Sequence, residues 1–265
     1  MEGFFQYEQK QIHYTMSGTG KTMVLLHGYL ESLEVWKGFS EKLSDKFTVV
    51  CVDLPGHGLS GIYDDIHTME FMASVVNELL VNLGIKKAFL AGHSLGGYVT
   101  LAFLEHFPEL LSGYCLFHSQ PFSDQPATIE KRKKEIGYVN AGKKNFMYPE
   151  NIEKMFAAVN LSRFPEELKR FKKIASKTPD QGIISALNGM MARPSRKALM
   201  EEGRVPCLWI LGLHDNYIPC NEIQQKVNLP ANAELVVLNS SGHLGFIEEE
   251  EESLKVLTAF IHKLA

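Results

Sequence analysis

One serine stands in a five-residue pattern that suits nucleophilic chemistry. Ser94 lies in Gly92-His93-Ser94-Leu95-Gly96, after the apolar run 88–92 and before residues 95–107, which have helical spacing. A serine on such a sharp strand-to-helix turn projects its hydroxyl outward, and the flanking glycines avoid collisions with neighbouring backbone. The sequence therefore predicts that Ser94 is a catalytic nucleophile.

A serine hydroxyl needs an adjacent base, usually a histidine that a carboxylate holds in one tautomer. Of the ten histidines, His243 is our candidate, because it lies in a loop of small residues between the last apolar run and the last helical segment. His93 and His118 stay open as pocket-lining residues. The neighbours of four others are typical of surface or structural positions: His13, His67, His106 and His262.

Asp215 is the expected acid that orients this base. It follows the apolar run 207–212, and the carboxyl ends of parallel strands are where open α/β sheets place their sites. Two other carboxylates compete for the role. Asp53 is better suited to a structural role, and Asp124 is a weaker alternative after the run 113–117.

Two backbone N–H groups are expected to form an oxyanion hole. Leu95 follows the nucleophile at the start of a helix, where its N–H would point toward an oxyanion. His27-Gly28-Tyr29-Leu30 follows the apolar run 23–27, where the second donor is expected. We assign that role to the N–H of Tyr29.

The elements that position these residues are predicted to form an α/β fold. Apolar runs alternate with amphipathic segments, and strands buried on both faces of a parallel sheet lack the alternation of half-exposed ones. The prediction is an eight-stranded, mostly parallel sheet flanked by helices. The strands are expected at residues 4–7 and 11–16, which pair antiparallel, and at 23–27, 47–53, 88–92, 113–117, 207–212 and 234–238. Helices are expected at 35–43, 69–83, 95–107, 221–227 and 248–263.

The alternation of strands and helices fails between residues 121 and 203. Charged helical stretches at 129–136 and 165–174 have no convincing strand between them. We interpret 121–203 as a helical cap inserted into a core formed by 1–120 and 204–265. The cap holds 16 Lys and Arg against 10 Asp and Glu, and solvated helix faces explain this charge better than steering of an anionic substrate.

Composition narrows the class of protein. With 265 residues, 45% of them apolar, the chain can bury one large core, and the net charge of −4 gives no general preference for nucleic acid. The sequence predicts neither a cleaved signal peptide nor an apolar segment long enough to cross a membrane. The cysteines lack metal-ligand spacing and fit reduced thiols of a cytoplasmic protein: Cys51, Cys115, Cys207 and Cys220. We expect a monomer or homodimer without metal, cofactor, nucleic acid or membrane partner.

Taken together, these motifs resemble the α/β-hydrolase superfamily, in its serine-nucleophile branch with a helical cap. The resemblance covers essentially the whole chain. It rests on His27-Gly28-Tyr29, Asp53-Leu54-Pro55-Gly56-His57-Gly58, Gly92-His93-Ser94-Leu95-Gly96-Gly97, Asp215 and His243, in this order. It implies that Ser94 attacks a carbonyl, that His243 takes and returns the proton, and that water hydrolyses an acyl-enzyme. Epoxide hydrolases and haloalkane dehalogenases need aspartate at the position of Ser94, so the chain departs from those branches.

Within the serine branch the chain looks like small esterases, meta-cleavage-product hydrolases, the menaquinone-pathway lyase and cofactor-free haloperoxidases, and the fold does not choose between them. The leading hypothesis is a carboxylesterase-like enzyme that cleaves a small carboxylic ester or thioester. A carbon–carbon bond hydrolase or lyase with the same triad stays open. A ligand-binding or signalling protein with a vestigial triad is the alternative from another class.

Six residues in the predicted cap are candidates for contact with the substrate. Arg193 could meet a substrate carboxylate, although surface salt bridging would also explain it. An apolar acyl pocket is expected from Phe122, Tyr138, Phe146, Met190 and Met191. Packing between cap and core would use the same apolar residues.

Overall fold

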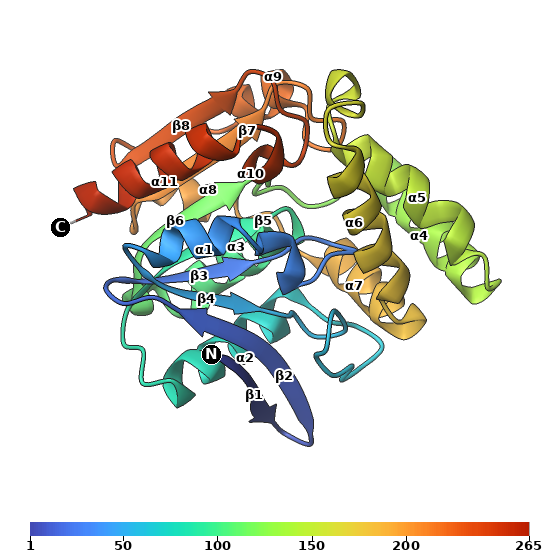
Figure 1. The fold of residues 1–265 in the computed structure, drawn as a ribbon, viewed down its shortest axis with the longest axis horizontal. Coiled ribbons are helices and arrows are strands. Elements are labelled where there is room, and N and C mark those ends of the chain that lie inside the picture. The colour runs from blue at the N-terminus through green and yellow to red at the C-terminus, as the bar shows by residue number, and fades with distance from the viewer. Residues whose placement is uncertain (265) are drawn as a thin grey trace.

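The computed structural model describes residues 1–264, which form one eight-stranded sheet in the order β1-β2-β4-β3-β5-β6-β7-β8 (Figure 1). β1 pairs antiparallel with β2, β2 pairs antiparallel with β4, and all other neighbours are parallel. The bounds are β1 Glu2–Tyr7, β2 Lys10–Ser17, β3 Thr22–Leu26, β4 Thr48–Val52, β5 Ala88–His93, β6 Leu111–Phe117, β7 Cys207–Gly212 and β8 Ala233–Leu238. The predicted fold class and all eight predicted strands are confirmed.

Helices cover both faces of the sheet. The chain moves in one direction across the sheet from β3 through α1 (Phe39–Ser44) to β4, and in the opposite direction from β4 through α2 (Met69–Asn82) to β5. Because such crossovers are right-handed, α1 and α2 must lie on opposite faces. α3 (Leu95–His106) packs against α2, and α11 (Glu250–Lys263) packs against α1. The connections that leave the neighbouring strands β3 and β5 therefore run to opposite faces of the sheet, and the carboxyl ends of these two strands border one crevice.

Three predicted helices are each divided into two shorter ones. The segment 35–43 consists of η1 (Leu33–Trp36) and α1, separated by Gly38, which has a φ of 83°. The segment 248–263 consists of α10 (Gly245–Glu248) and α11, which are separated at Glu249, where φ is −135°. The segment 221–227 consists of α9 (Cys220–Ile223) and η4 (Gln224–Lys226), and η2 (Pro108–Leu110) precedes β6. The helical spacing was correct, but the turns within it depend on local backbone angles.

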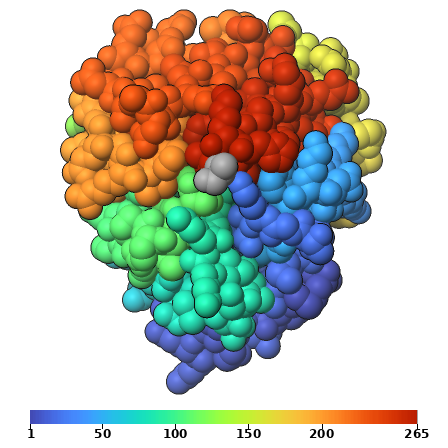
Figure 2. All heavy atoms as spheres, turned by 90° about the vertical axis from the view of Figure 1, so that its left-hand side faces the viewer, coloured from blue at the N-terminus to red at the C-terminus, as the bar shows by residue number. Residues whose placement is uncertain are grey.

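Helices α4 to α7 stand over the carboxyl ends of the strands, at the right of Figure 1. They are α4 Pro126–Asn140, α5 Lys144–Met155, α6 Pro165–Lys177 and α7 Asp180–Ala192, with η3 Ala158–Asn160 between α5 and α6. α4 packs against α7, and α5 packs against α6. Figure 2, in which the left-hand side of Figure 1 faces the viewer, shows yellow atoms of these helices only at the upper right-hand rim of the molecule. The cap is therefore confined to one end of the protein.

The last part of the predicted cap segment contacts the core instead. α8 (Lys197–Glu202) lies apart from α4 to α7 in Figure 1. Just before it, Arg196 forms ion pairs with Glu105 of α3, at 2.7 Å, and with Glu70 of α2. The helices that stand over the site therefore end at α7.

Within residues 1–264, every helix is too short or too polar to cross a lipid bilayer. All four cysteines are buried and free. Each is enclosed by the packed core, so none of them offers a thiol to the surface.

The buried His13 of β2 links folding stability to pH. Its Nδ1 lies 2.7 Å from Asp53 Oδ2 and its Nε2 lies 2.9 Å from Glu2 Oε1. The hydrogen bond to Asp53, followed by the attraction of both carboxylates, raises the pKa of His13 despite its burial. Protonated His13 therefore stabilises the fold fully below an unfolded pKa of about 6.5, and this contribution is lost as pH rises through the higher folded pKa.

We expect the difference in free energy of unfolding between the wild type and His13→Gln to be larger at about pH 5.5 than at about pH 9. Urea unfolding at both values measures it. His262→Gln, on the exposed side of α11, serves as the matched control. A difference that does not change with pH would contradict the linkage.

Candidate active site

Ser94 occupies the junction of β5 and α3 in strained backbone geometry. Its φ is 48° and its ψ is −110°, in a region that only glycine adopts readily. The surrounding chain holds it there: the Ser94 N–H donates to Phe117 O at 3.0 Å, and the Ser119 hydroxyl donates to Ser94 O at 2.7 Å. The side chain of Ser94 is partly exposed, whereas its neighbours in the turn are buried.

Glycine is required on both sides of this turn. A Cβ at Gly92 would lie 2.2 Å from Gly96 O, and a Cβ at Gly96 would lie 2.3 Å from Leu26 O. Both contacts are with backbone, which cannot move aside as a flexible side chain can. Close approach of β5, α3 and β3 therefore explains the glycine spacing around Ser94.

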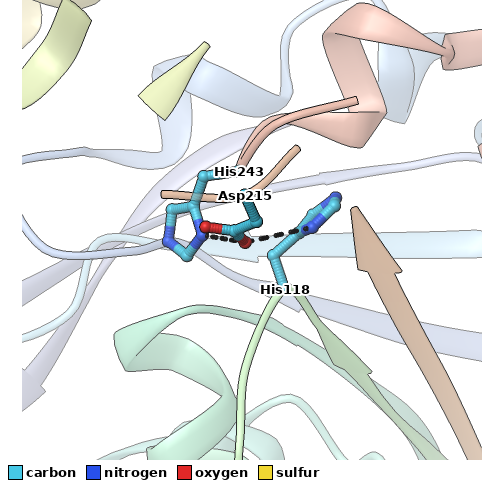
Figure 3. Close-up of side chains that lie close together, drawn as sticks. All are labelled: His118, Asp215 and His243. Atoms are coloured by element: carbon cyan, nitrogen blue, oxygen red, sulfur yellow. Dashed lines mark hydrogen bonds and ion pairs between the residues drawn. The ribbon is translucent and has the colours of Figure 1, made fainter. Parts of the chain in front are cut away.

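His243 and Asp215 form an acid–base pair in the loops after β8 and β7. His243 Nδ1 lies 2.7 Å from Asp215 Oδ2, as Figure 3 shows. The other carboxylate oxygen accepts the N–H groups of Tyr217, at 2.7 Å, and Ile218, at 2.9 Å. Burial alone would raise the pKa of Asp215, but the interactions with His243 and His118 outweigh it and hold that pKa below its usual range. An ionised Asp215 fixes the proton of His243 on Nδ1 and leaves Nε2 as a base.

A second histidine faces the same carboxylate. Figure 3 shows Asp215 between the rings of His243 and His118, with His118 Nδ1 3.6 Å from Asp215 Oδ2. His118 Nε2 accepts the N–H of Gly245 at 2.9 Å, so its proton is on Nδ1. Burial lowers the pKa of His118 to about 4, and the ring is neutral near pH 7.

These three side chains lie close enough together to suggest a metal site. Their hydrogen bonds indicate another role. The Nδ1 atoms of both rings carry protons directed at Asp215, and the remaining lone pair of His118 is occupied by Gly245. The donor set thus fits an orienting carboxylate better than a metal ligand shell, which needs free lone pairs.

The loop after β3 is arranged to present the N–H of Tyr29. His27 Nε2 accepts the Leu54 N–H at 3.0 Å, so His27 Nδ1 donates to Gly28 O at 2.8 Å. In a trans peptide the C=O and N–H point in opposite directions, so the Tyr29 N–H points away from His27. Leu30 has a φ of 62°. Within residues 1–264 the N–H groups of Tyr29 and Leu95 donate no hydrogen bond, so both are unpaired.

A cavity of about 1080 Å³ lies between the core and the cap, and Ser94, His243 and Tyr29 all line it. Four of the six predicted substrate contacts line this cavity: Phe122, Tyr138, Phe146 and Met190. Tyr138 and Phe146 are 51% and 81% exposed, which places them at its rim. Residues that sequence reasoning missed include Tyr98, Gln120, Met147, Met155, Tyr217 and Ile218. Met147 and Met155 were missed because helix α5 was not predicted.

Arg193 and Met191 differ from expectation, because neither lines this cavity. The Arg193 guanidinium is buried, lies 3.9 Å over the ring of Tyr98 and donates to Met190 O at 2.7 Å. Its Nη2 lies 2.8 Å from Asp124 Oδ1. Arg193 therefore packs in the interior, and its buried guanidinium does not reach the cavity where a substrate carboxylate would bind.

The two rival carboxylates are both occupied elsewhere. Asp124 binds Arg132, at 2.6 Å, as well as Arg193. Asp53 binds His13 and accepts the N–H groups of Leu33 and Leu59. Neither carboxylate is bonded to His243, so both have structural roles.

The other histidines differ in part from expectation. His13 and His67 are buried instead of surface-like, and both are held by hydrogen bonds. His93 and His118 are buried behind the cavity and do not line it. Hydrogen bonding in the interior explains these residues better than contact with substrate.

The loop that carries His243 is tied to the cap as well as to the core. The His243 N–H donates to Met155 O at 2.6 Å, at the end of α5. Glu248 accepts the N–H of Ala157 at 2.8 Å and the N–H of Gly242 at 2.9 Å. One buried carboxylate thus bridges the cap and the loop that carries His243.

A sequence model described as the alpha/beta hydrolase fold matches residues 21–250. The chain belongs to this family. A solved structure of a thermophilic esterase from Thermogutta terrifontis, with malate bound, superposes on this α/β hydrolase with a TM-score of 0.93 at 26% identity, covering 100% of this chain and 99% of the other.

Two curated relatives show the range of proteins similar to this α/β hydrolase. The pimeloyl-[acyl-carrier protein] methyl ester esterase of Vibrio cholerae is 25% identical over 256 residues, which cover 94% of this chain and 97% of the relative. The dihydrolipoyllysine-residue acetyltransferase component of the acetoin cleaving system of Pseudomonas putida is 28% identical over 255 residues. That match covers 94% of this chain but only 66% of the relative, so the chain spans just under two thirds of the relative's length.

We expect His118 to stay neutral, with its single proton on Nδ1, from about pH 8 down to about pH 5, because burial lowers its pKa to about 4. Nitrogen-15 NMR of labelled histidine rings measures this. Exposed His106 is the internal control. Protonation of His118 near the ordinary histidine value would show that the ring is not enclosed as described.

Proposed function

We propose that this α/β hydrolase is a serine hydrolase that cleaves a small carboxylic ester or thioester through an acyl-enzyme. The observation that carries the proposal is the arrangement of Ser94, His243 and Asp215. Ser94, on its strained turn, lines the same cavity as His243, and His243 Nδ1 is bound to a buried carboxylate at 2.7 Å. Such a constellation activates a serine hydroxyl at neutral pH.

In this proposal the reaction has two halves. Ser94 Oγ attacks the carbonyl carbon while His243 Nε2 takes its proton, and the N–H groups of Tyr29 and Leu95 stabilise the oxyanion. Collapse breaks the bond to the leaving alkoxide or thiolate, which receives the proton from His243. Water, deprotonated by His243, then attacks the acyl-enzyme and releases the acid and Ser94. Asp215 stabilises the imidazolium that forms in each half.

The cavity supports an ester or thioester with an apolar acyl part. Its volume of about 1080 Å³ is at the upper end of the range for small-molecule pockets. Several apolar side chains line it, namely Phe122, Met147, Met155, Met190 and Ile218. The names of the Vibrio cholerae and Thermogutta terrifontis proteins, both esterases, support the same class of reaction.

Carbon–carbon bond cleavage is the second candidate, because cationic side chains also line the cavity: Lys131, Arg132, Lys134, Lys154 and Lys226. Most of them are already neutralised. Arg132 binds Asp124, Lys154 binds Glu150, and Lys226 lies 3.9 Å from Glu222. These pairs leave little excess positive charge for a polyanionic substrate, so we favour the ester.

We expect a fluorophosphonate probe to label the protein at Ser94 and Ser94→Ala to abolish the labelling, because only an activated hydroxyl displaces fluoride at a useful rate. Mass spectrometry of the labelled peptide measures it. A series of p-nitrophenyl esters with increasing acyl length then tests turnover. Labelling that survives in Ser94→Ala would show that Ser94 is not the nucleophile. Labelling without turnover of any ester would favour carbon–carbon cleavage.

Asp215→Asn should lower kcat by about 10⁴, because the amide no longer holds the proton of His243 on Nδ1. Steady-state kinetics on the best p-nitrophenyl ester and thermal unfolding of both proteins provide the measurements. Asp45→Asn, an exposed carboxylate after α1, is the matched control and should retain full activity. Comparable kcat values for the wild type and Asp215→Asn would show that Asp215 does not orient His243.

A further inference from the structure

Behind His243 lies a second histidine, His93, whose two ring nitrogens both face hydrogen-bond acceptors. His93 Nδ1 lies 2.9 Å from Glu31 Oε2, and His93 Nε2 lies 2.8 Å from the carbonyl oxygen of His243. A carbonyl oxygen can only accept. A neutral imidazole carries a single proton, so one of these contacts would set two lone pairs against each other. The geometry is satisfied only when protons occupy both sides of the ring.

Glu31 is held as the matching anion. Its Oε2 accepts the N–H of Gly28 at 2.5 Å as well as the His93 contact, and the side chains of Glu31 and His93 are fully buried. Burial alone would raise the pKa of Glu31, but the attraction of His93 and its hydrogen bond outweigh it, and that pKa is lowered. Both protons between the pair and His243 are therefore assigned to His93.

We propose that Glu31 and His93 form a buried ion pair whose Nε2–H holds the main chain of His243, which makes both of them positioning residues for catalysis. The proposal rests on the proposed function, because it gives His243 the role of base. The pair joins three segments that are distant in sequence: the loop after β3, the end of β5, and the loop after β8. The oxyanion loop, the nucleophile turn and the base are thereby fixed relative to one another.

The surroundings of His93 enclose the pair on every side. The rings of His243 and His118 face it, with centroids 4.8 Å and 6.2 Å away, and the imidazole of His27 lies near enough to interact with the pair as well. Trp36 and Phe246 enclose the remaining sides. Because this environment excludes water, removal of one partner would strand an unpaired charge, whereas replacement of both by apolar groups of similar size is often neutral for stability.

The same pair explains the glycine at position 28. A Cβ there would lie 2.8 Å from His93 Nδ1 and 2.9 Å from Glu31 Oε2, so a side chain would push the pair apart. Glu31 binds the Gly28 N–H, while His27 binds the Gly28 carbonyl. Two consecutive peptides that lead to the Tyr29 N–H are thus each held by a buried side chain.

The first test counts the protons on His93 and needs no turnover. In nitrogen-15 NMR of the wild type at about pH 7, we expect two ring N–H signals for His93 that exchange slowly with water. Glu31→Gln should remove one of them. A single N–H on His93 in the wild type would overturn the ion pair.

The second test is the double variant Glu31→Leu/His93→Phe. We expect its Tm to equal or exceed that of the wild type, kcat on a p-nitrophenyl ester to fall by about 10- to 100-fold, and KM to stay the same. The Nδ1–H signal of His243, shared with Asp215, should shift or broaden. His13→Gln is the matched control, since His13 is also a buried histidine between two acceptors, and its kcat should equal that of the wild type.

The outcomes separate the two proposals. A folded double variant with wild-type kcat and an unchanged His243 signal would overturn the positioning role. If the wild type shows neither probe labelling nor turnover, the proposed function fails, while the His93 and His243 signals still decide the ion pair and its hold on the loop. If the double variant does not fold, Glu31→Gln decides by the same readouts: a lower kcat and a lost His93 proton support the proposal, and wild-type values contradict it.

Discussion

The strained backbone of Ser94 is the constraint on which the site depends. A non-glycine residue in this region costs about 1–3 kcal/mol and persists only where its surroundings over-determine it. Here the determinants are packing contacts: β5, α3 and β3 approach so closely that Gly92 and Gly96 have no room for a Cβ. Among residues 1–264, four non-glycine residues have positive φ, and Leu30, Ser94 and His118 of these lie at the site. Strain is concentrated where the cavity meets the sheet.

The order of the strands explains why these loops converge. β3 lies between β4 and β5, and the chain reverses its direction across the sheet there. The loops after β3 and β5 therefore diverge to opposite faces and leave a crevice between them. Tyr29 and Ser94 border it, and the loops after β7 and β8 bring Asp215 and His243 over the same edge. Sheet topology sets the positions, and buried hydrogen bonds then fix each side chain.

Features that depend on local sequence could be predicted, and those that depend on contacts between distant segments could not. The six strands after residue 20 were found because each is a short apolar run, and Ser94, Asp215 and His243 because each follows such a run. α5 was missed because Pro149 interrupts its pattern. α7 was missed although its glycines have a purpose, since a Cβ at Gly182 would lie 2.0 Å from Gly56 O. That need is visible only once the cap is packed against the core.

Charged and polar side chains were hardest to place for the same reason. Arg193 was expected to meet a substrate, but Asp124 and Tyr98, which occupy it, come from other parts of the chain. His93 stood beside the nucleophile in the motif, yet its neighbours Glu31 and His243 come from other loops. A residue type indicates what chemistry is available. Only the partners that the fold supplies show whether that chemistry is free or already engaged.

The bridge between α5 and the loop of His243 sets a limit on how the cap can be exchanged. In α7 the cap meets the core through one main-chain hydrogen bond, which the His67 N–H donates to Ser185 O at 3.0 Å. Met155 O and the Ala157 N–H have a further role, because they hold the main chain of His243 and the carboxylate of Glu248. A chimaera that grafts a foreign cap onto this core must therefore keep the main-chain contacts of residues 155–157, or it will replace the cavity lining and at the same time release the loop that carries His243.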